Sequence, residues 1–393
     1  MEPILIVGIA LALLFNFVNG LNDAANSVAT VVATRVLTPL QAVLLAAFFN
    51  MVGPLVFTTV VATTIGKGIV GAEFMTTQVI LIGLVSAILW VTVSSYSGIP
   101  ISASHALVGG LIGSAAAFAG LDAILWPDAG TVAWLAFYAA IGAALGGTVL
   151  GLFGYLKGEE DLFHIIGLGA LCGMAISIPV ITVMKILPVS GILAILVFIV
   201  VAPVIGLIAA FLIGMAVVRF FRNKNSRTMN SLFRKLQLLS ASFYSIGHGS
   251  NDAQNAMGVI TAILVAGGLL SEFIVPLWVI IVSASAIALG TFFGGWRVVE
   301  TMATKITKLR PYQGFCAETG GGLVLAFVTA SGVPVSTTHA ISGAIMGVGA
   351  SRGYSAVQWG VVRRIVAAWI LTIPLTSAFA FLSFLLFRMF SQG

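Results

Sequence analysis

The sequence predicts an all-α polytopic membrane protein built from two repeats. Hydrophobic residues make up 60% of its 393 residues and charged residues only 8%, so the chain cannot present an ordinary charged surface to water. Apolar runs close to the roughly 20 residues that a membrane-spanning helix needs recur along it. Two polar motifs each occur twice, in the same order, which indicates a duplicated unit with a site shared between the copies.

The first motif places an acid and two amides inside an apolar run. It reads GLNDAANSV at 20–28 and GSNDAQNAM at 249–257, once in each half of the chain. A single helix over 3–32 would be about 45 Å long, well beyond the hydrocarbon core of a bilayer. We therefore expect a break near Asn19 to Asn22, and a matching polar break at 249–257.

The second motif predicts a short helix that starts beside it. It reads SGIPISASHALVGGLIG at 97–113 and SGVPVSTTHAISGAIMG at 331–347, and the two copies are identical at eight of seventeen positions. Pro100 suits a first helical turn, and Ser102 and Ser104 are good capping residues. If the helix starts at membrane depth, as half of a re-entrant hairpin, its free amides form an anion site. The alternative is a full span that starts at the membrane surface.

The remaining apolar runs predict the other spans. They lie near 40–63, 77–95, 98–118, 131–156, 163–186, 190–218, 273–295, 313–330 and 356–390. An odd number of spans in each half would give the two copies opposite orientations across the membrane. A two-fold axis in the membrane plane would then bring the two polar motifs face to face near the midplane.

Basic residues cluster where membrane topology would place them. Ten of the 18 Lys and Arg lie at 219–235 and 297–310, and three more at 352–364, which the positive-inside rule assigns to cytoplasmic loops. The net charge of +6 therefore does not call for a nucleic-acid partner. We divide the chain into a first transmembrane repeat (1–218), a basic interfacial linker in the cytoplasm (219–237) and a second transmembrane repeat (238–393).

The carboxylates of the first motif predict a cation site. A charged aspartate inside a membrane costs about 2.5–3.5 kcal/mol, and no Lys or Arg lies near Asp23 or Asp252 in sequence, so a cation from solution is the expected partner. Amides three or four residues apart can turn to one side of a helix, and their hard oxygens suit sodium. The alternative is that the amides bond interrupted backbone and the aspartates act as caps. The predicted sodium ligands are Asn22, Asp23, Asn26, Asn251, Asp252 and Asn255.

Hydroxyls and amides of the second motif predict an anion site. Such groups bind an anion without an arginine clamp, weakly enough to release it. A serine in a membrane helix can also simply bond the carbonyl one turn back. His105 and His339 either donate to the anion or fix the hairpin. The other candidate residues are Ser102, Ser104, Ser336, Thr337 and Thr338, together with the backbone amides at the start of each short helix, including that of Ala103.

The doubled motifs resemble the inorganic phosphate transporter family. The resemblance rests on GxNDxxN, on SGxPxSxxHAxxG and on TMATKITKLRPYQGFCAE at 301–318, and it covers nearly the whole chain. It implies about twelve spans in inverted repeats with broken helices, a central cytoplasmic loop, termini outside, a homodimer and phosphate as substrate. It also matches Glu318, which follows Gly314 and Phe315, to a family glutamate. We expect Glu318 at or near the cation path; the alternative is a glutamate that faces water at the membrane surface.

We therefore predict a secondary active transporter that imports inorganic phosphate across the inner (cytoplasmic) membrane by symport with sodium ions, and that needs no other cofactor. Proton coupling, and transport of sulfate or another tetrahedral oxyanion, stay open as alternatives. Two other classes fit less well. An intramembrane hydrolase would carry two sets of Ser, His and Asp, and a passive channel would not need paired aspartates in two matched half-sites.

Overall fold

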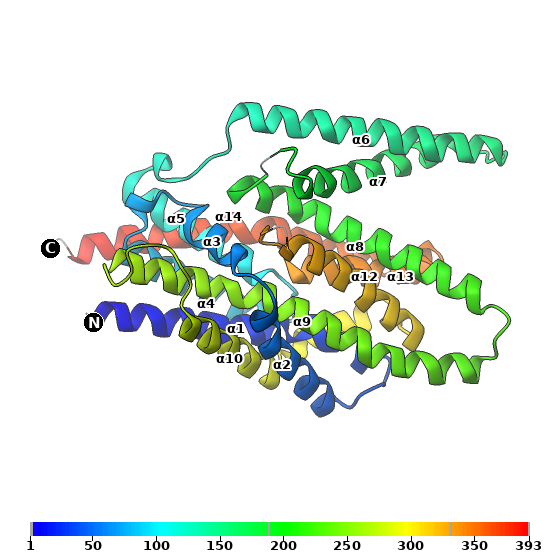
Figure 1. The fold of residues 1–393 in the computed structure, drawn as a ribbon, viewed down its shortest axis with the longest axis horizontal. Coiled ribbons are helices and arrows are strands. Elements are labelled where there is room, and N and C mark those ends of the chain that lie inside the picture. Colours follow the sequence, from blue (N-terminus) through cyan, green and yellow to red (C-terminus); the bar gives the residue numbers. More distant parts are fainter. Residues whose placement is uncertain (1–2, 188, 331, 392–393) are drawn as a thin grey trace.

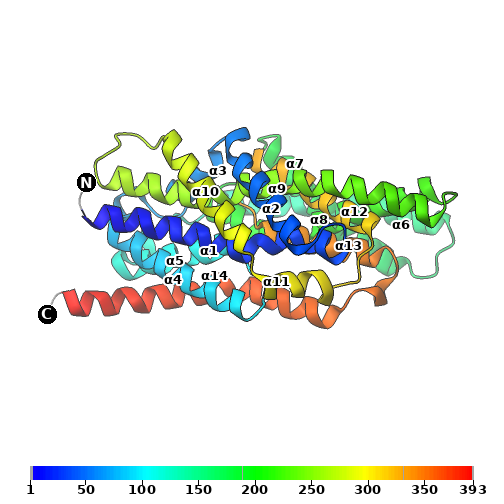
Figure 2. The same cartoon turned by 90° about the horizontal axis from the view of Figure 1, so that it is seen from below.

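Long helices that lie nearly side by side form an elongated bundle (Figure 1, Figure 2). The computed structural model describes residues 3–187, 189–330 and 332–391. Ser331, the first residue of the second SGxP motif, falls outside them. Both chain ends lie at one end of the bundle, and the turn between α8 (Gly191–Phe221) and α9 (Ser226–Ala266) lies at the other (Figure 1).

The first half of the chain begins with five helices. They are α1 (Pro3–Ala33), α2 (Pro39–Val56), α3 (Val60–Lys67), α4 (Thr77–Tyr96) and α5 (Ala103–Ala119). The span expected over 40–63 is two helices, because the chain leaves the helical conformation between Val56 and Val60. The short helix expected over 98–118 begins only at Ala103, after the serine that caps it.

A hairpin of two long helices, α6 (Ala129–Leu156) and α7 (Leu162–Val183), follows and lies along one side of the bundle (Figure 1). Their backbones approach as closely as glycine allows. A Cβ atom on Gly146 would lie 2.1 Å from the Gly169 carbonyl oxygen, and one on Gly173 would lie 2.0 Å from that of Gly142. Small residues are what brings membrane helices together, since the lipid provides no hydrophobic drive between them.

α8 and α9 follow, and the second copy of the first motif lies on α9. Only residues 222–225 of the basic stretch 219–237 lie outside these two helices, so the stretch predicted as a linker is mostly the end of one helix and the start of the next. The helices that follow are α10 (Leu277–Phe293), α11 (Trp296–Glu300) with a π-helical continuation (Thr301–Lys305), α12 (Pro311–Ala330), α13 (Thr337–Ala350) and α14 (Trp359–Ser391).

The breaks predicted within the first motif are wrong. α1 runs unbroken through 20–28, and α9 runs unbroken through 249–257. A continuous helix satisfies its own backbone groups, and the polar side chains here are buried in protein rather than exposed to lipid. Excess length alone requires no break either, because a long helix can tilt or extend past the hydrocarbon core.

Close helix contacts repeat between the two halves. A Cβ atom on Gly20 of α1 would lie 2.3 Å from the Ile287 carbonyl oxygen of α10, and one on Gly249 of α9 would lie 2.2 Å from the Asn50 carbonyl oxygen of α2. Likewise, α5 packs on α14 and α13 packs on α8. α1 and α9 run in opposite directions along the bundle (Figure 1). The two copies of the first motif therefore lie on antiparallel helices.

Seven of the described helices are long and apolar enough to cross a membrane, or eight if α10 and the segment bent by 64° after it form one span. α9 and α12 are not among them although they are long enough, because polar residues lower their hydropathy. α5 is an apolar helix of only 17 residues. A total near twelve spans stays a prediction.

Two apolar cores flank the first motif. On α1, Phe15 before the motif belongs to one core and Val28 to the other. On α9, Ala256 packs in the core of Phe15, and Tyr244 packs in the core of Val28. The polar residues of both helices therefore lie where the two cores meet.

Candidate functional site

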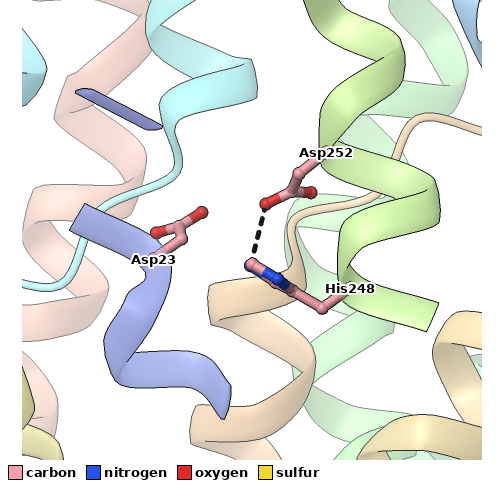
Figure 3. Close-up of side chains that lie close together, drawn as sticks. All are labelled: Asp23, His248 and Asp252. Carbon is pink, nitrogen blue, oxygen red and sulfur yellow. Dashed lines mark ion pairs between the residues drawn. The ribbon is translucent and has the colours of Figure 1, made fainter. Parts of the chain in front are cut away.

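Two buried carboxylates, Asp23 of α1 and Asp252 of α9, face each other (Figure 3). His248 lies one turn before Asp252, with its Nε2 3.2 Å from Asp252 Oδ2. One ligand atom from each of these three residues lies within 4.8 Å of the other two, so together they could hold a metal ion. The two copies of the first motif, far apart in the sequence, thus meet at one point.

The first turn of α13 connects the two carboxylates. Thr337 Oγ1 donates to Asp252 Oδ2 at 3.0 Å. Thr338 Oγ1 lies 3.1 Å from Asp23 Oδ1 and 3.1 Å from the Ile101 carbonyl, to either of which it can donate. The Asn26 amide donates to both hydroxyls, at 3.2 and 3.0 Å. Hydroxyls predicted to bind an anion therefore adjoin carboxylates predicted to bind a cation.

The asparagines at the end of each first motif make reciprocal contacts. Asn26, in the first copy, donates to Thr338 in the second SGxP motif at 3.0 Å. Asn255, in the second copy, donates to Ser104 in the first SGxP motif at 2.7 Å. Ser104 and Thr338 are counterparts, because they hold the same position in the two SGxP motifs. Each repeat therefore supports the SGxP motif of the other repeat, and neither half-site is complete alone.

The asparagines before each aspartate form a second matched pair of contacts. Ser95 of α4 donates to Asn22 Oδ1 at 2.7 Å, and Asn251 donates to Thr329 of α12 at 3.0 Å. Ser95 and Thr329 are also counterparts, because each lies at the same distance before its SGxP motif. Asn22 Nδ2 in addition donates to Asp23 Oδ1 at 2.6 Å. These bonds hold each motif helix against the helix that leads into its own SGxP motif.

Both short helices start with a buried serine cap. Ser102 Oγ accepts from the His105 amide at 3.3 Å, and Ser336 Oγ accepts from the His339 amide at 3.2 Å. The first amides of a helix, here including that of Ala103, have no acceptor within the helix. The starts of α5 and α13 therefore present amides to the interior, where an anion could accept from them.

His105 and His339 lie ring to ring, with their centroids 4.9 Å apart. His339 also stacks on Trp369 of α14 at 3.9 Å, and its Nδ1 lies 3.3 Å from the Ile199 carbonyl. These contacts hold the starts of α5 and α13 together, and a role of each ring in fixing its own hairpin stays a prediction. Direct binding of an anion by these rings stays a prediction.

Some buried polar atoms of this cluster have no hydrogen-bond partner within the described residues. They are Asp252 Oδ1, Asn26 Oδ1, His105 Nδ1 and His339 Nε2. A buried polar group without a partner is costly, so each such group needs an explanation. Acceptor oxygens beside the two carboxylates fit a cation, and ring nitrogens at the helix starts fit a hydrogen-bonding solute.

Glu318 of α12 lies in a separate polar cluster and is fully buried. The alternative, a glutamate that faces water at the membrane surface, is therefore wrong. Gln237 of α9 donates to one carboxylate oxygen at 3.0 Å, and Ser240 donates to the other. Thr34, at the end of α1, donates to Gln237 Oε1 at 2.9 Å. Glu318 therefore joins α12 to α9 and, through Gln237, to α1, apart from the group formed by Asp23 and Asp252.

The repeated motifs do not include His248, Ser95 and Thr329, which contact Asp252, Asn22 and Asn251. His248 directly precedes GSNDAQNAM, the second copy of the first motif. Asn19 takes the same place before the first copy. Ser95 and Thr329 each lie two residues before an SGxP motif. For Ser95 and Thr329, a hydroxyl residue at the same place before each SGxP motif was the signal that could have identified them.

These residues lie in a region that matches a known family. The family described as the phosphate transporter family matches residues 19–167 and again residues 164–380, and each match contains one copy of both motifs. The chain belongs to the phosphate transporter family. It is thus a multi-pass membrane protein of a transporter family and not an enzyme, which excludes the hydrolase alternative.

Relatives of this family align over almost the full chain. A probable low-affinity inorganic phosphate transporter of Rhizobium meliloti (strain 1021) is 44% identical over 95% of this chain and 93% of that protein. A protein of the same description from Bacillus subtilis (strain 168) is 34% identical over 98% of this chain and 97% of its own. A solved structure, described as the sodium-dependent phosphate transporter, matches with a TM-score of 0.70 and 27% identity over 99% of this chain and all of that one.

Proposed function

We propose that this chain imports inorganic phosphate across the cytoplasmic membrane together with sodium ions. Phosphate is supported by the phosphate transporters among its relatives in this family, and sodium by the sodium-dependent transporter whose fold it shares. The observation on which the proposal depends most is the meeting of Asp23, Asp252 and the hydroxyls of Thr337 and Thr338 in one buried cluster.

The two carboxylates offer a site for a cation. Within the described residues, His248 is the one basic side chain at ion-pair distance from either of them. Two buried carboxylates repel each other and have lost their hydration, so a bound cation stabilises the pair. Carboxylate, amide and hydroxyl oxygens, here with those of Asn26 and Thr338, are ligands that a hard cation prefers.

We place phosphate at the starts of α5 and α13. Both helices begin in the buried interior, and the rings of His105 and His339 touch there. Free amides and hydroxyls donate to phosphate oxygens, and the positive end of each helix dipole favours the anion. With sodium bound beside Thr338, the charges of anion and cation offset each other, which links the binding of one to that of the other.

Two inverted repeats explain transport. When they exchange conformations, the site that opened to one side of the membrane opens to the other. The antiparallel course of α1 and α9, and the reciprocal bonds from Asn26 to Thr338 and from Asn255 to Ser104, support this symmetry. The basic turn between α8 and α9 faces the cytoplasm under the positive-inside rule. Both termini, at the opposite end of the bundle, then lie outside. The homodimer and the three-part division of the chain stay predictions.

Proton coupling is the second candidate, favoured by one contact. His248 is a titratable group 3.2 Å from Asp252, so a proton could take the place of the sodium ion there. Sulfate remains an alternative substrate, because hydroxyls and amides do not discriminate strongly between tetrahedral oxyanions.

The test is uptake of radiolabelled phosphate into proteoliposomes that contain the purified chain. We expect an inward sodium gradient to drive uptake when the pH is the same on both sides of the membrane. Excess sulfate should reduce this uptake only slightly. A pH gradient that drives uptake equally well without sodium would replace sodium by protons. Sulfate that competes at the same concentration as phosphate would contradict the substrate assignment.

A further inference from the structure

A basic pocket lies at the end of the bundle where α8 turns into α9. Its volume is about 590 Å³, and four of its lining residues are exposed basic residues, Arg222, Lys224, Arg227 and Arg310. No described ion pair involves any of the four, and none of the described residues that line the pocket is acidic. Four like charges in one small space repel one another unless an anion lies among them.

Part of the pocket wall is apolar and aromatic. Phe221 and Tyr312 line it, and both pack on the buried ring of Phe233, at centroid distances of 5.5 and 6.3 Å. The same pocket thus offers both cationic side chains and an aromatic surface. A small, fully hydrated anion would use only the cationic side chains.

An apolar stripe on α8 leads directly to this pocket. Leu212, Met215 and Val218 are spaced three residues apart and are 58%, 49% and 51% exposed. Residues at this spacing share a face of a helix, and Val218 itself lines the pocket, one turn before Arg222. In a bilayer this stripe would contact acyl chains, and the pocket would lie at headgroup level.

We propose that this pocket binds an anionic phospholipid, with the phosphate of the headgroup among the four basic side chains and one acyl chain along Leu212, Met215 and Val218. Basic pockets at the cytoplasmic end of transmembrane helices are suited to such headgroups. The lipid would join α8, α9 and the start of α12, the helix that holds Glu318. This inference does not depend on which solute the central site transports.

The test uses the full-length protein, purified in detergent. Phosphatidylglycerol, phosphatidylcholine or inorganic phosphate is titrated in, and binding is followed by native mass spectrometry and by thermal unfolding. The pocket variant combines Arg222→Gln, Arg227→Gln and Arg310→Gln. The control variant combines Arg219→Gln, Arg363→Gln and Arg364→Gln, which removes the same charge from exposed arginines that do not line the pocket.

We expect phosphatidylglycerol to bind and stabilise the wild type and the control, and phosphatidylcholine to do neither. The pocket variant should bind phosphatidylglycerol at least about tenfold more weakly, because each basic residue near an anionic surface strengthens binding by roughly fivefold. If that variant does not fold, Lys224→Gln serves instead, since Lys224 lies in the turn outside both helices, and should weaken binding by roughly fivefold.

Equal binding of phosphatidylglycerol by the pocket and control variants would overturn the proposal. So would equal binding of phosphatidylcholine by the wild type. Inorganic phosphate that displaces phosphatidylglycerol from the wild type at micromolar concentration would identify the pocket as a site for the free anion and would overturn the assignment to lipid.

Discussion

The Asn255 side-chain amide of α9 donates a 2.7 Å hydrogen bond to the hydroxyl of Ser104 on α5. The same bond exists in the other half of the molecule, from Asn26 to Thr338. Unlike Ser104 among the described contacts, Thr338 also places its hydroxyl 3.1 Å from the carboxylate of Asp23. The two half-sites thus share one plan but are unequal in charge.

This inequality predicts different effects for two matched substitutions. Ser104→Ala and Thr338→Ala should both raise the phosphate concentration for half-maximal uptake. A lost hydrogen bond to a charged group costs on the order of 1.5–3 kcal/mol, which is roughly 10- to 150-fold in affinity. Thr338→Ala should in addition raise the sodium requirement, because it removes a group beside Asp23. Uptake kinetics at varied phosphate and sodium measure both effects.

Ser114→Ala is the control for these two variants. Ser114 is buried on the same helix as Ser104 but, among the described residues, bonds only backbone carbonyls, those of Val79, Gly110 and Leu111. Its removal should leave both half-saturation values within about twofold of wild type. A phosphate half-saturation value that is unchanged in Ser104→Ala and Thr338→Ala would place phosphate elsewhere.

The carboxylates of Asp23 and Asp252 are expected to be essential for coupling. Asp23→Asn and Asp252→Asn keep the shape of the side chain but remove the charge that a cation would neutralise. Each variant should insert and purify normally and should lose sodium-driven phosphate uptake to the level of empty liposomes. Normal sodium dependence in either variant would contradict the cation site.

His248→Asn tests the choice between sodium and protons. The counterpart of His248 in the first repeat is Asn19, so asparagine suits an equivalent place in the fold. With sodium as the coupling ion, the variant should keep sodium-driven uptake, with a half-saturation value for sodium changed by several-fold through the lost contact with Asp252. Uptake driven by a pH gradient in the wild type, and abolished in this variant, would instead favour proton coupling.

The sequence was sufficient to predict which residues would gather, but not how. The doubled motifs identified Asp23, Asp252, Thr337 and Thr338, and the structure brings these residues together. The continuity of α1 could not be inferred from its polar residues. In a bundle their side chains are covered by neighbouring helices, whose positions the local sequence does not specify.

The crossed contacts between repeats were equally out of reach. Asn26 could have bonded its own SGxP motif or that of the other repeat, because nothing in the spacing distinguishes a separate pair of halves from an interleaved one. The structure has the interleaved form, with Asn26 on Thr338. The role of His248 was hidden for a different reason, since its counterpart Asn19 breaks the match between the copies.

Helix packing around the first motif predicts a stability effect. Gly249→Ala would place a Cβ atom 2.2 Å from the Asn50 carbonyl oxygen, a backbone atom that cannot move aside. Overpacking of this kind costs about 1–3 kcal/mol. The variant should therefore unfold at a lower temperature in detergent. Gly167→Ala on α7 is the control, because no atom of a neighbouring described residue outside its own helix turn lies within 4 Å of the added atom. Equal unfolding temperatures for the two variants would contradict the close contact of α9 with α2.

Glu318 provides the last prediction, because its carboxylate is buried yet lies outside the group of Asp23 and Asp252. Gln237 and Ser240 donate to its two oxygens, so the site is prepared for an anionic side chain. If a cation passes it or rests there, Glu318→Gln should lower the number of sodium ions coupled to each phosphate, or stop net uptake, while phosphate binding persists. Phosphate binding by equilibrium dialysis and the sodium Hill coefficient of uptake measure these outcomes separately.

The control for that substitution is Gln237→Glu. It disturbs the same hydrogen bonds and places a second carboxylate 3.0 Å from the first, so it should reduce stability and change sodium affinity. A purely structural Glu318 predicts that both variants lose thermal stability and that neither changes the Hill coefficient. Loss of coupling in Glu318→Gln at an unchanged unfolding temperature would assign the carboxylate to the path of the cation. This substitution would then have removed the charge without disturbing the fold, and only an ion that interacts with that charge would respond.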